Sequence, residues 1–192
     1  PYLSRGLGDV YKRQAMEPVV MTEAFADACQ KLRFAAEKEA ASLSPVAICS
    51  KLLKLGYNDR EIEEIKNCNE VFSSGNMPYV LMATLARLLL EGHSWEGKGS
   101  AQTHDVPSIT LKRPVLIELH HADPTTAALF ADVRKTLGLP FVNTDYRAFA
   151  RWPSYFNPAW IDLRSIILRE EYEHAVRRVH DAAVLLAGGL PN

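Results

Sequence analysis

The sequence lacks several features that would assign it to a chemical or cellular class. Its three cysteines include no Cys-x-x-Cys pair, which argues against a disulfide framework, a zinc site and a thiol redox centre. No apolar run approaches the roughly 20 residues that a membrane-spanning helix needs. A membrane is therefore not an expected partner. The formal net charge is only −1, so a nucleic acid is not an expected partner either. We predict a cytoplasmic protein with reduced cysteines.

What is present is typical of a globular chain. The 192 residues are 47% hydrophobic and 23% charged, which is enough for one sizeable core. Apolar residues recur at helical spacing, as in the stripe of Phe25, Ala28 and Leu32, and no segment shows sustained two-residue alternation. We therefore predict an all-α fold. Residues 1–14 lack this periodicity and resemble a translated artefact found at the ends of assembled metagenomic sequences, so we exclude them as a non-native tail.

Capping and breaking residues divide the periodic pattern into helices. Asn58 and Glu61 form a capping sequence that predicts a helix start, and residues 73–75 are predicted to end that helix before another over 79–91. Pro153 is predicted to stop the helix that precedes it. Further helices are predicted to begin at Ser44-Pro45 and Pro124 and to cover 114–121 and 161–187.

The stretch 141–163, FVNTDYRAFARWPSYFNPAWIDL, concentrates aromatic residues around one acid. Asn143 and Thr144 favour helix capping, which puts Asp145 at or just inside a helix N-terminus. A carboxylate among apolar groups can have its pKa raised by desolvation and act as a base near neutral pH. A simple cap is the other role that fits Asp145. Arg147 likewise suits either a substrate carboxylate or a neighbouring acid.

A second stretch, SSGNMPY over 73–79, also suggests a site. Gly75-Asn76 favours a tight turn, which would leave the Asn76 amide and the Tyr79 phenol at the mouth of the next helix. Groups there can bind an anion, although turn chemistry and a core tyrosine explain the same residues. The histidines at 104, 120 and 121 lack helical i, i+4 pairing with a carboxylate, so no metal site is predicted.

Both stretches resemble the group I 2-haloacid dehalogenases, the halocarboxylic acid dehalogenase family. The resemblance extends from about residue 16 to the C-terminus, and a Gly-Asn with a nearby Tyr matches Asn76 and Tyr79. The order Met77-Pro78 departs from the family pattern. The signature residues of the second half are Pro140, Val142, Asn143, Thr144, Asp145, Tyr146, Arg147, Ala150, Pro153, Ala159 and Trp160.

The resemblance implies a reaction and a set of roles. In that family the aspartate that matches Asp145 activates a water, which displaces halide from a short 2-haloalkanoic acid without a covalent ester and inverts the configuration. No cofactor or metal is implied, and a homodimer is one expected assembly. A non-catalytic helical ligand-binding or interaction module of the same fold is the alternative. The substrate-binding residues implied are Asn76, Tyr79, Asn143, Thr144, Tyr146 and Arg147.

The chain also carries the pattern of an internal repeat. A shift of 147 residues aligns Ala28 with Ala175 and Leu32 with Val179 within two amphipathic stretches. Chance similarity of two such helices can imitate a repeat, but the family resemblance implies a pseudo-dimer of two homologous helical halves on an alkylhydroperoxidase-D-like scaffold. We predict that 15–92 is the second part of repeat one, 93–113 a linker and 114–192 the first part of repeat two.

The repeat has an arithmetical consequence. The first-half counterpart of Asp145 would fall at 145 − 147 = −2, and the second-half counterpart of Asn76 at 76 + 147 = 223. Both positions lie outside the 192 residues. The expectation is therefore a middle fragment that lacks part of each half.

Overall fold

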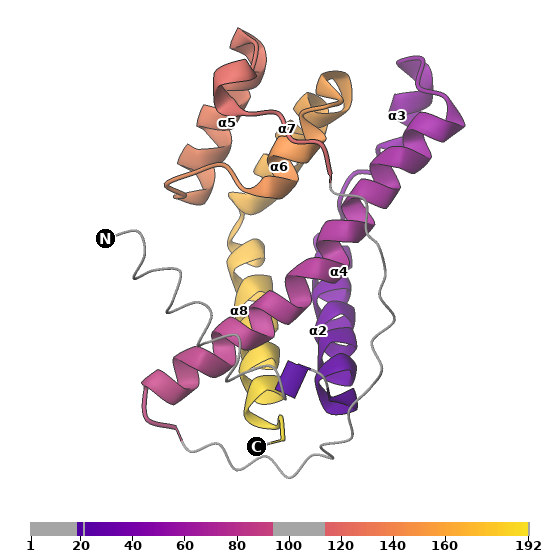
Figure 1. Cartoon of the computed structure of the whole chain (residues 1–192). Helices are drawn as coiled ribbons and strands as arrows, with labels where there is room; N and C mark the ends of the chain where they lie inside the picture. The colour runs from indigo at the N-terminus through magenta and orange to yellow at the C-terminus, as the bar shows by residue number, and fades with distance from the viewer. Residues whose placement is uncertain (1–18, 21, 94–113, 192) are drawn as a thin grey trace. The chain divides into compact units, whose positions relative to one another are not determined.

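A computed structural model of the chain describes residues 19–20, 22–93 and 114–191. Every regular element in these ranges is helical apart from one bridge residue, Thr22, which confirms the all-α prediction (Figure 1). The predicted tail 1–14 and positions 94–113 of the predicted linker lie outside the described residues. The elements are α2 (Glu23–Ser42), α3 (Cys49–Lys54), α4 (Asp59–Leu90), η1 (Leu119–His121), α5 (Pro124–Leu137), α6 (Thr144–Phe149), α7 (Pro153–Ile167) and α8 (Glu170–Gly188).

Local capping explains where the longer helices begin. Before α2, the Thr22 hydroxyl accepts a hydrogen bond from the Phe25 amide at 3.2 Å. Before α4, Asn58 and Glu61 form a capping box: each side chain accepts the other residue's amide N–H at 3.0 Å. Asp123 accepts two first-turn amides of α5. The predicted helix starts at Asn58 and Pro124 are confirmed.

The predicted break at residues 73–75 is wrong, because α4 runs through it as one helix of 32 residues with Pro78 inside. A proline within a helix costs about 3 kcal/mol. Downstream of Pro78, the leucines at 81, 85 and 88 are all buried, and each such side chain stabilises by roughly 1.5–3 kcal/mol. Their burial therefore outweighs the break signal. Asn76 and Tyr79 consequently lie in the middle of α4 and not at a helix mouth.

Other boundaries also differ from the predictions. Pro153 is the first residue of α7 and so opens a helix where a stop was predicted. The predicted helix over 161–187 is divided between α7 and α8, with Leu168 and Arg169 between them. Residues 114–118 are not helical, and the second helix begins at Cys49, five residues after Ser44.

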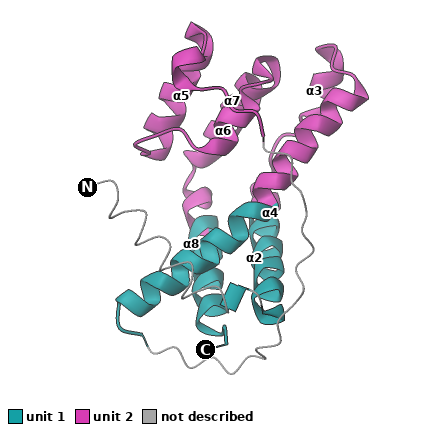
Figure 2. Ribbon diagram, viewed as in Figure 1, with its two compact units in different colours: residues 1–39, 74–109, 175–192 teal, residues 40–73, 110–174 magenta. Residues whose placement is uncertain are grey.

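The chain divides into two compact units, coloured in Figure 2. Unit 1 comprises residues 1–39, 74–109 and 175–192, and unit 2 comprises 40–73 and 110–174. The boundary between them falls inside both α4 and α8, so each unit takes residues from both halves of the chain. The predicted division into sequential repeats stays a prediction. None of the described helices combines the length and the apolar character that crossing a bilayer requires.

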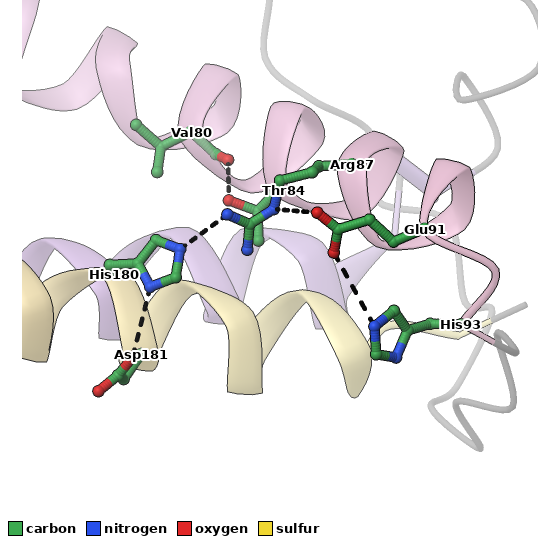
Figure 3. A network of polar contacts seen from close by, with 7 residues as sticks. All are labelled: Val80, Thr84, Arg87, Glu91, His93, His180 and Asp181. Atoms are coloured by element: carbon green, nitrogen blue, oxygen red, sulfur yellow. Dashed lines mark hydrogen bonds and ion pairs between the residues drawn. The ribbon is translucent and has the colours of Figure 1, made fainter.

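Unit 1 has an aliphatic core between α2, the second part of α4 and α8. Leu32 and Leu81 have no exposed surface, and Ala183 and Ala187 let the helices approach closely. Residues of α4 and α8, with His93 after the end of α4, form a polar network at the surface of the unit (Figure 3). The other buried members of this core are Val19, Phe25, Ala28, Leu85, Leu88 and Leu190.

Unit 2 has a core that is rich in aromatic residues. In this unit α7 packs against both α5 and α6. A smaller cluster joins α3 to the first part of α4 through Leu52, Ile62 and Ile65. The buried members of the larger cluster are Phe130, Val133, Val142, Ala150, Phe156 and Trp160.

Candidate active site

The short helix α6 carries most of the predicted site residues. Asn143 precedes it with extended backbone angles, φ −61° and ψ 157°, but its side chain makes no capping hydrogen bond. Thr144 is the first helical residue and is exposed, while Asp145 is half-buried. The Asp145 carboxylate accepts the backbone N–H of Tyr146 at 3.0 Å. Asp145 thus binds a first-turn amide from inside the helix and not from the cap position.

Aromatic rings surround the beginning of α6. The Tyr146 ring stacks on Phe156 with centroids 6.1 Å apart and meets Trp160 edge to face at 5.7 Å. Trp160 is 2% exposed, and its indole N–H donates to the Asp132 carboxylate at 2.7 Å. This hydrogen bond holds the indole in one orientation, so the rings form an ordered wall next to Asp145.

Burial raises the pKa of Asp145 above its ordinary value, because desolvation penalises the charged carboxylate. Hydrogen bonds from the amides of Tyr146 and of Asp145 itself lower this pKa, but by less than burial raises it. Burial and the nearby Asp145 charge also raise the pKa of Tyr146. A carboxylate with a raised pKa is a stronger base than an ordinary aspartate, which is the property that water activation requires.

A pocket with a volume of about 530 Å³ lies in unit 2, and two of its lining residues, Arg151 and Trp152, follow Asp145 by six and seven positions in the sequence (151 − 145 and 152 − 145). Cys68 of α4 lines the pocket, and the pKa of its thiol is raised mainly by burial and further by the charge of Asp145. No local sequence pattern indicates this pocket, because Cys68 is 77 positions from Asp145 (145 − 68). The other lining residues are Glu64, Asn67, Val71, Pro114, Val115, Arg151 and Trp152.

Arg147 is occupied by a neighbouring acid. Its guanidinium forms an ion pair with Glu118 and also donates to the Ile117 carbonyl at 3.5 Å. The backbone adds a third link, since the Ile117 amide donates to the Arg147 carbonyl at 3.0 Å. Of the two roles that the sequence left open for Arg147, this geometry matches the pairing with a nearby acid.

The structure brings five of the predicted residues together, namely 143–147 at the start of α6. The remaining two, Asn76 and Tyr79, belong to unit 1, and Tyr79 is 72% exposed. Among the described side chains, no group of three histidines, cysteines or acids converges in a way that could hold a metal ion. Unit 2 therefore contains a desolvated carboxylate, that of Asp145, next to packed aromatic rings, and it also contains a pocket.

Comparison with known proteins places this geometry in context. The chain is 43% identical over 183 residues to an (R)-2-haloacid dehalogenase of Rhizobium sp. (strain NHG3), a match that covers 93% of this chain and 70% of the relative. It is 36% identical over 146 residues to an (R)-2-haloacid dehalogenase of Pseudomonas putida, covering 73% of the chain and 48% of that protein. A configuration-inverting 2-haloacid dehalogenase of Pseudomonas sp. (strain 113) is 25% identical over 179 residues, with coverages of 88% and 58%. No family model matches the chain.

Solved structures of D-2-haloacid dehalogenases also resemble this chain. A D-2-haloacid dehalogenase mutant in complex with D-2-CPA superposes with a TM-score of 0.87 at 29% identity, covering 95% of this chain and 64% of that one. The complex of D-2-haloacid dehalogenase with L-LA superposes with a TM-score of 0.85 at 31% identity, covering 95% of this chain and 65% of that one. The chain therefore spans about two thirds of the length of these solved relatives.

Proposed function

Because the chain belongs to the 2-haloacid dehalogenase family, we propose that it hydrolyses short 2-haloalkanoic acids to 2-hydroxy acids with inversion of configuration. The desolvated carboxylate of Asp145 is the observation that carries this proposal. The (R) enantiomer is the preferred substrate, since two relatives at 43% and 36% identity are named (R)-2-haloacid dehalogenases. A non-catalytic binding module of the same fold has no observation in its favour.

In the proposed reaction Asp145 acts as a general base. It takes a proton from a water molecule while the water oxygen forms a bond to the second carbon of the substrate. The carbon–halogen bond breaks on the opposite side, its electron pair leaves with the halide, and the configuration inverts. Halide is a competent leaving group, so the proposed reaction needs no cofactor. The protein contributes position and desolvation.

The remaining predicted residues have supporting roles in this proposal. Asn143, Thr144 and Tyr146 line the approach to Asp145 from the start of α6. The ion pair between Arg147 and Glu118 supports a positioning role for Arg147, since it ties α6 to the segment before η1. Asn76 and Tyr79 are proposed to orient the water or the departing halide.

The repeat is part of the same proposal. The first residues of α2 and α8 are Glu23 and Glu170, which are 147 positions apart (170 − 23), the shift that aligns the two sequences. The paired residues Ala28 and Ala175 are each 4% exposed. These matches support two homologous helical halves related as a pseudo-dimer.

The experiment that tests the reaction is single-turnover hydrolysis of 2-chloropropionate in oxygen-18 water, with halide release measured in parallel. Direct attack places the heavy oxygen in the first hydroxy-acid product. An ester on Asp145 would instead give an unlabelled first product and leave label on the enzyme, which would refute direct attack. Absence of halide release would favour the binding-module alternative. Comparing the two enantiomers checks the stereochemical preference.

The proposal also covers the cellular location and the assembly of the protein. Cysteines 29, 49 and 68 are free thiols, which supports a reducing, cytoplasmic location. A homodimer is tested by light scattering across a range of protein concentrations.

A further inference from the structure

Arg151 lines this pocket and, within the described part of the chain, has no salt-bridge partner. Its guanidinium lies 4.7 Å from the centroid of the Trp152 ring, a cation–π contact that leaves the N–H edges of the guanidinium available. No ion pair of Arg151 is found among the residues that the structure describes. The other charged residue that lines the pocket is Glu64, and Arg60 pairs with it at 3.3 Å.

The electrostatics of Cys68 link this cation to Asp145. The Arg151 charge lowers the pKa of the Cys68 thiol, whereas the Asp145 charge raises it. Both charges therefore lie within electrostatic reach of one thiol that lines the pocket. A negatively charged substrate can approach the proposed base there with an opposite charge close by.

Two other groups that could bind a substrate carboxylate are already engaged. Arg147 is paired with Glu118, and the first-turn amide of Tyr146 is bonded to Asp145. The helix α6 has six residues, which is too short to provide a strong anion site at its N-terminus. Among the residues that the structure describes, Arg151 is thus the cation in the lining of this pocket.

We propose that the pocket lined by Cys68, Arg151 and Trp152 binds the 2-haloalkanoic acid and that the Arg151 guanidinium pairs with its carboxylate. This inference rests on the proposed function and identifies the cation that recognises the substrate. Planar guanidinium and carboxylate groups match in a two-point hydrogen-bonded pair. The apolar side chains of Val71 and Trp152 in the same lining suit the short hydrocarbon part of the substrate.

The test replaces Arg151 with Gln and with Lys, and uses Arg134→Gln as the matched control. Arg134 is an exposed arginine of α5 in the same unit and does not line the pocket. Kinetics with 2-chloropropionate are measured together with calorimetric binding of propionate, an unreactive acid of the same size. Arg151→Gln should raise KM and the propionate Kd about tenfold and leave kcat within about twofold, because a charged hydrogen bond that is uniform along the reaction is lost. Arg151→Lys should recover part of the loss, and Arg134→Gln should change neither constant.

Each outcome separates this inference from the proposed reaction. Unchanged KM and Kd in Arg151→Gln would overturn the role of Arg151 while leaving the dehalogenase proposal intact. Propionate binding that depends on Arg151 without halide release would uphold the carboxylate site and refute the reaction. On the unmodified protein, propionate should bind more tightly than propionamide, its neutral isostere. Equal binding of the two would overturn the inference even if a variant failed to fold.

Discussion

The two units bury different kinds of side chain. Unit 1 is held by leucines and alanines, with Leu32 and Leu81 fully buried and Ala183 at the helix contacts. Unit 2 is held by rings such as Phe156 and Trp160, and the indole of Trp160 needs a polar partner. Small and aliphatic residues allow close, purely structural packing of helices. Aromatic residues create apolar surroundings that can hold a polar group in place and shift its pKa.

The polar network of unit 1 and the Asp145 carboxylate of unit 2 also differ in their exposure to solvent. In unit 1 the polar network of Figure 3 is at the surface, and Arg87 and His180 have side chains that are 45% and 49% exposed. In unit 2 the carboxylate of Asp145 is half-buried and desolvated. Exposed charges are screened and contribute little energy, whereas a desolvated charge is both costly and reactive. We therefore expect substitutions in the core of unit 1 to affect mainly stability and substitutions at the proposed base of unit 2 to affect mainly activity.

The largest expected effect is on activity in unit 2. Asp145→Asn keeps the shape of the side chain and an acceptor for the Tyr146 amide but removes the base, so kcat should fall ~10²–10⁴-fold. Circular dichroism should show the helical content of the wild type. The measurement is initial halide release from 2-chloropropionate. A near-normal rate would mean that Asp145 only binds its helix amide.

The pH dependence of Asp145 gives a second prediction. Its pKa in the folded protein is raised above the unfolded value, so ionised Asp145 destabilises the fold. This cost is absent below the unfolded pKa, ~3.9, and grows as the pH rises through the folded pKa. Asp145→Asn should therefore melt at a higher temperature than wild type near pH 7, and the difference should shrink as the pH falls. In the wild type, kcat should decline over the same acidic range as the base becomes protonated. A melting temperature for Asp145→Asn below that of the wild type at pH 7 would contradict this.

A substitution in the core of unit 1 should have the opposite effect: it should lower the stability of the protein and leave kcat unchanged. Leu32→Ala leaves a cavity in the aliphatic core and should lower the free energy of unfolding by about 2–5 kcal/mol, while kcat per folded molecule stays unchanged. Val179→Ala is the matched control from α8, the helix that the proposed repeat pairs with α2, since Val179 is smaller and only half-buried. It should cost about 1 kcal/mol or less. Denaturant unfolding measures the free energy of unfolding of both variants. Equal losses would show that the buried Leu32 contributes no more to stability than the half-buried Val179.

Replacing Asp132 in unit 2 should lower both the stability of the protein and its activity. Asp132→Ala leaves the indole N–H of Trp160 buried without its acceptor, which should cost about 1–3 kcal/mol. Because Trp160 contacts the Tyr146 ring next to the proposed base, kcat should fall as well. Asp132→Asn retains an acceptor oxygen and should recover part of both losses. Stability lost without any change in kcat would show that the aromatic wall has only a structural role.

Local signals in the sequence predicted part of this structure well. The capping box of Asn58 and Glu61 needs only residues three apart, and Pro124 marks the first turn of α5 by itself, so both helix starts can be predicted from neighbouring residues. The continuity of α4 through Pro78 was not readable, because it depends on leucines that are buried by helices distant in sequence.

For the candidate site, too, local sequence indicates some features and only the fold shows the others. The family signature identified Asp145 and its neighbours on α6, because these residues are consecutive. The occupation of Arg147 by Glu118 depends on a contact 29 residues away, and Cys68 and Arg151 share a pocket only through the fold. Arg151 stands within the signature stretch, but its type alone does not distinguish it from Arg147.

The smallest expected effect is on the surface network of unit 1. Arginine only donates hydrogen bonds, so the His180 Nε2 that lies 2.9 Å from the Arg87 guanidinium must accept, and the other ring nitrogen faces Asp181. His180→Ala removes this bridge between α4 and α8, but Arg87 keeps its ion pair with Glu91 and gains access to water. The free energy of unfolding should change by no more than about 0.5 kcal/mol, and kcat should not change. Urea unfolding alongside Leu32→Ala gives the scale. A loss comparable to that of the buried leucine would mean that unit 1 depends on its polar surface as much as on its aliphatic core, and the contrast between the two units would fail.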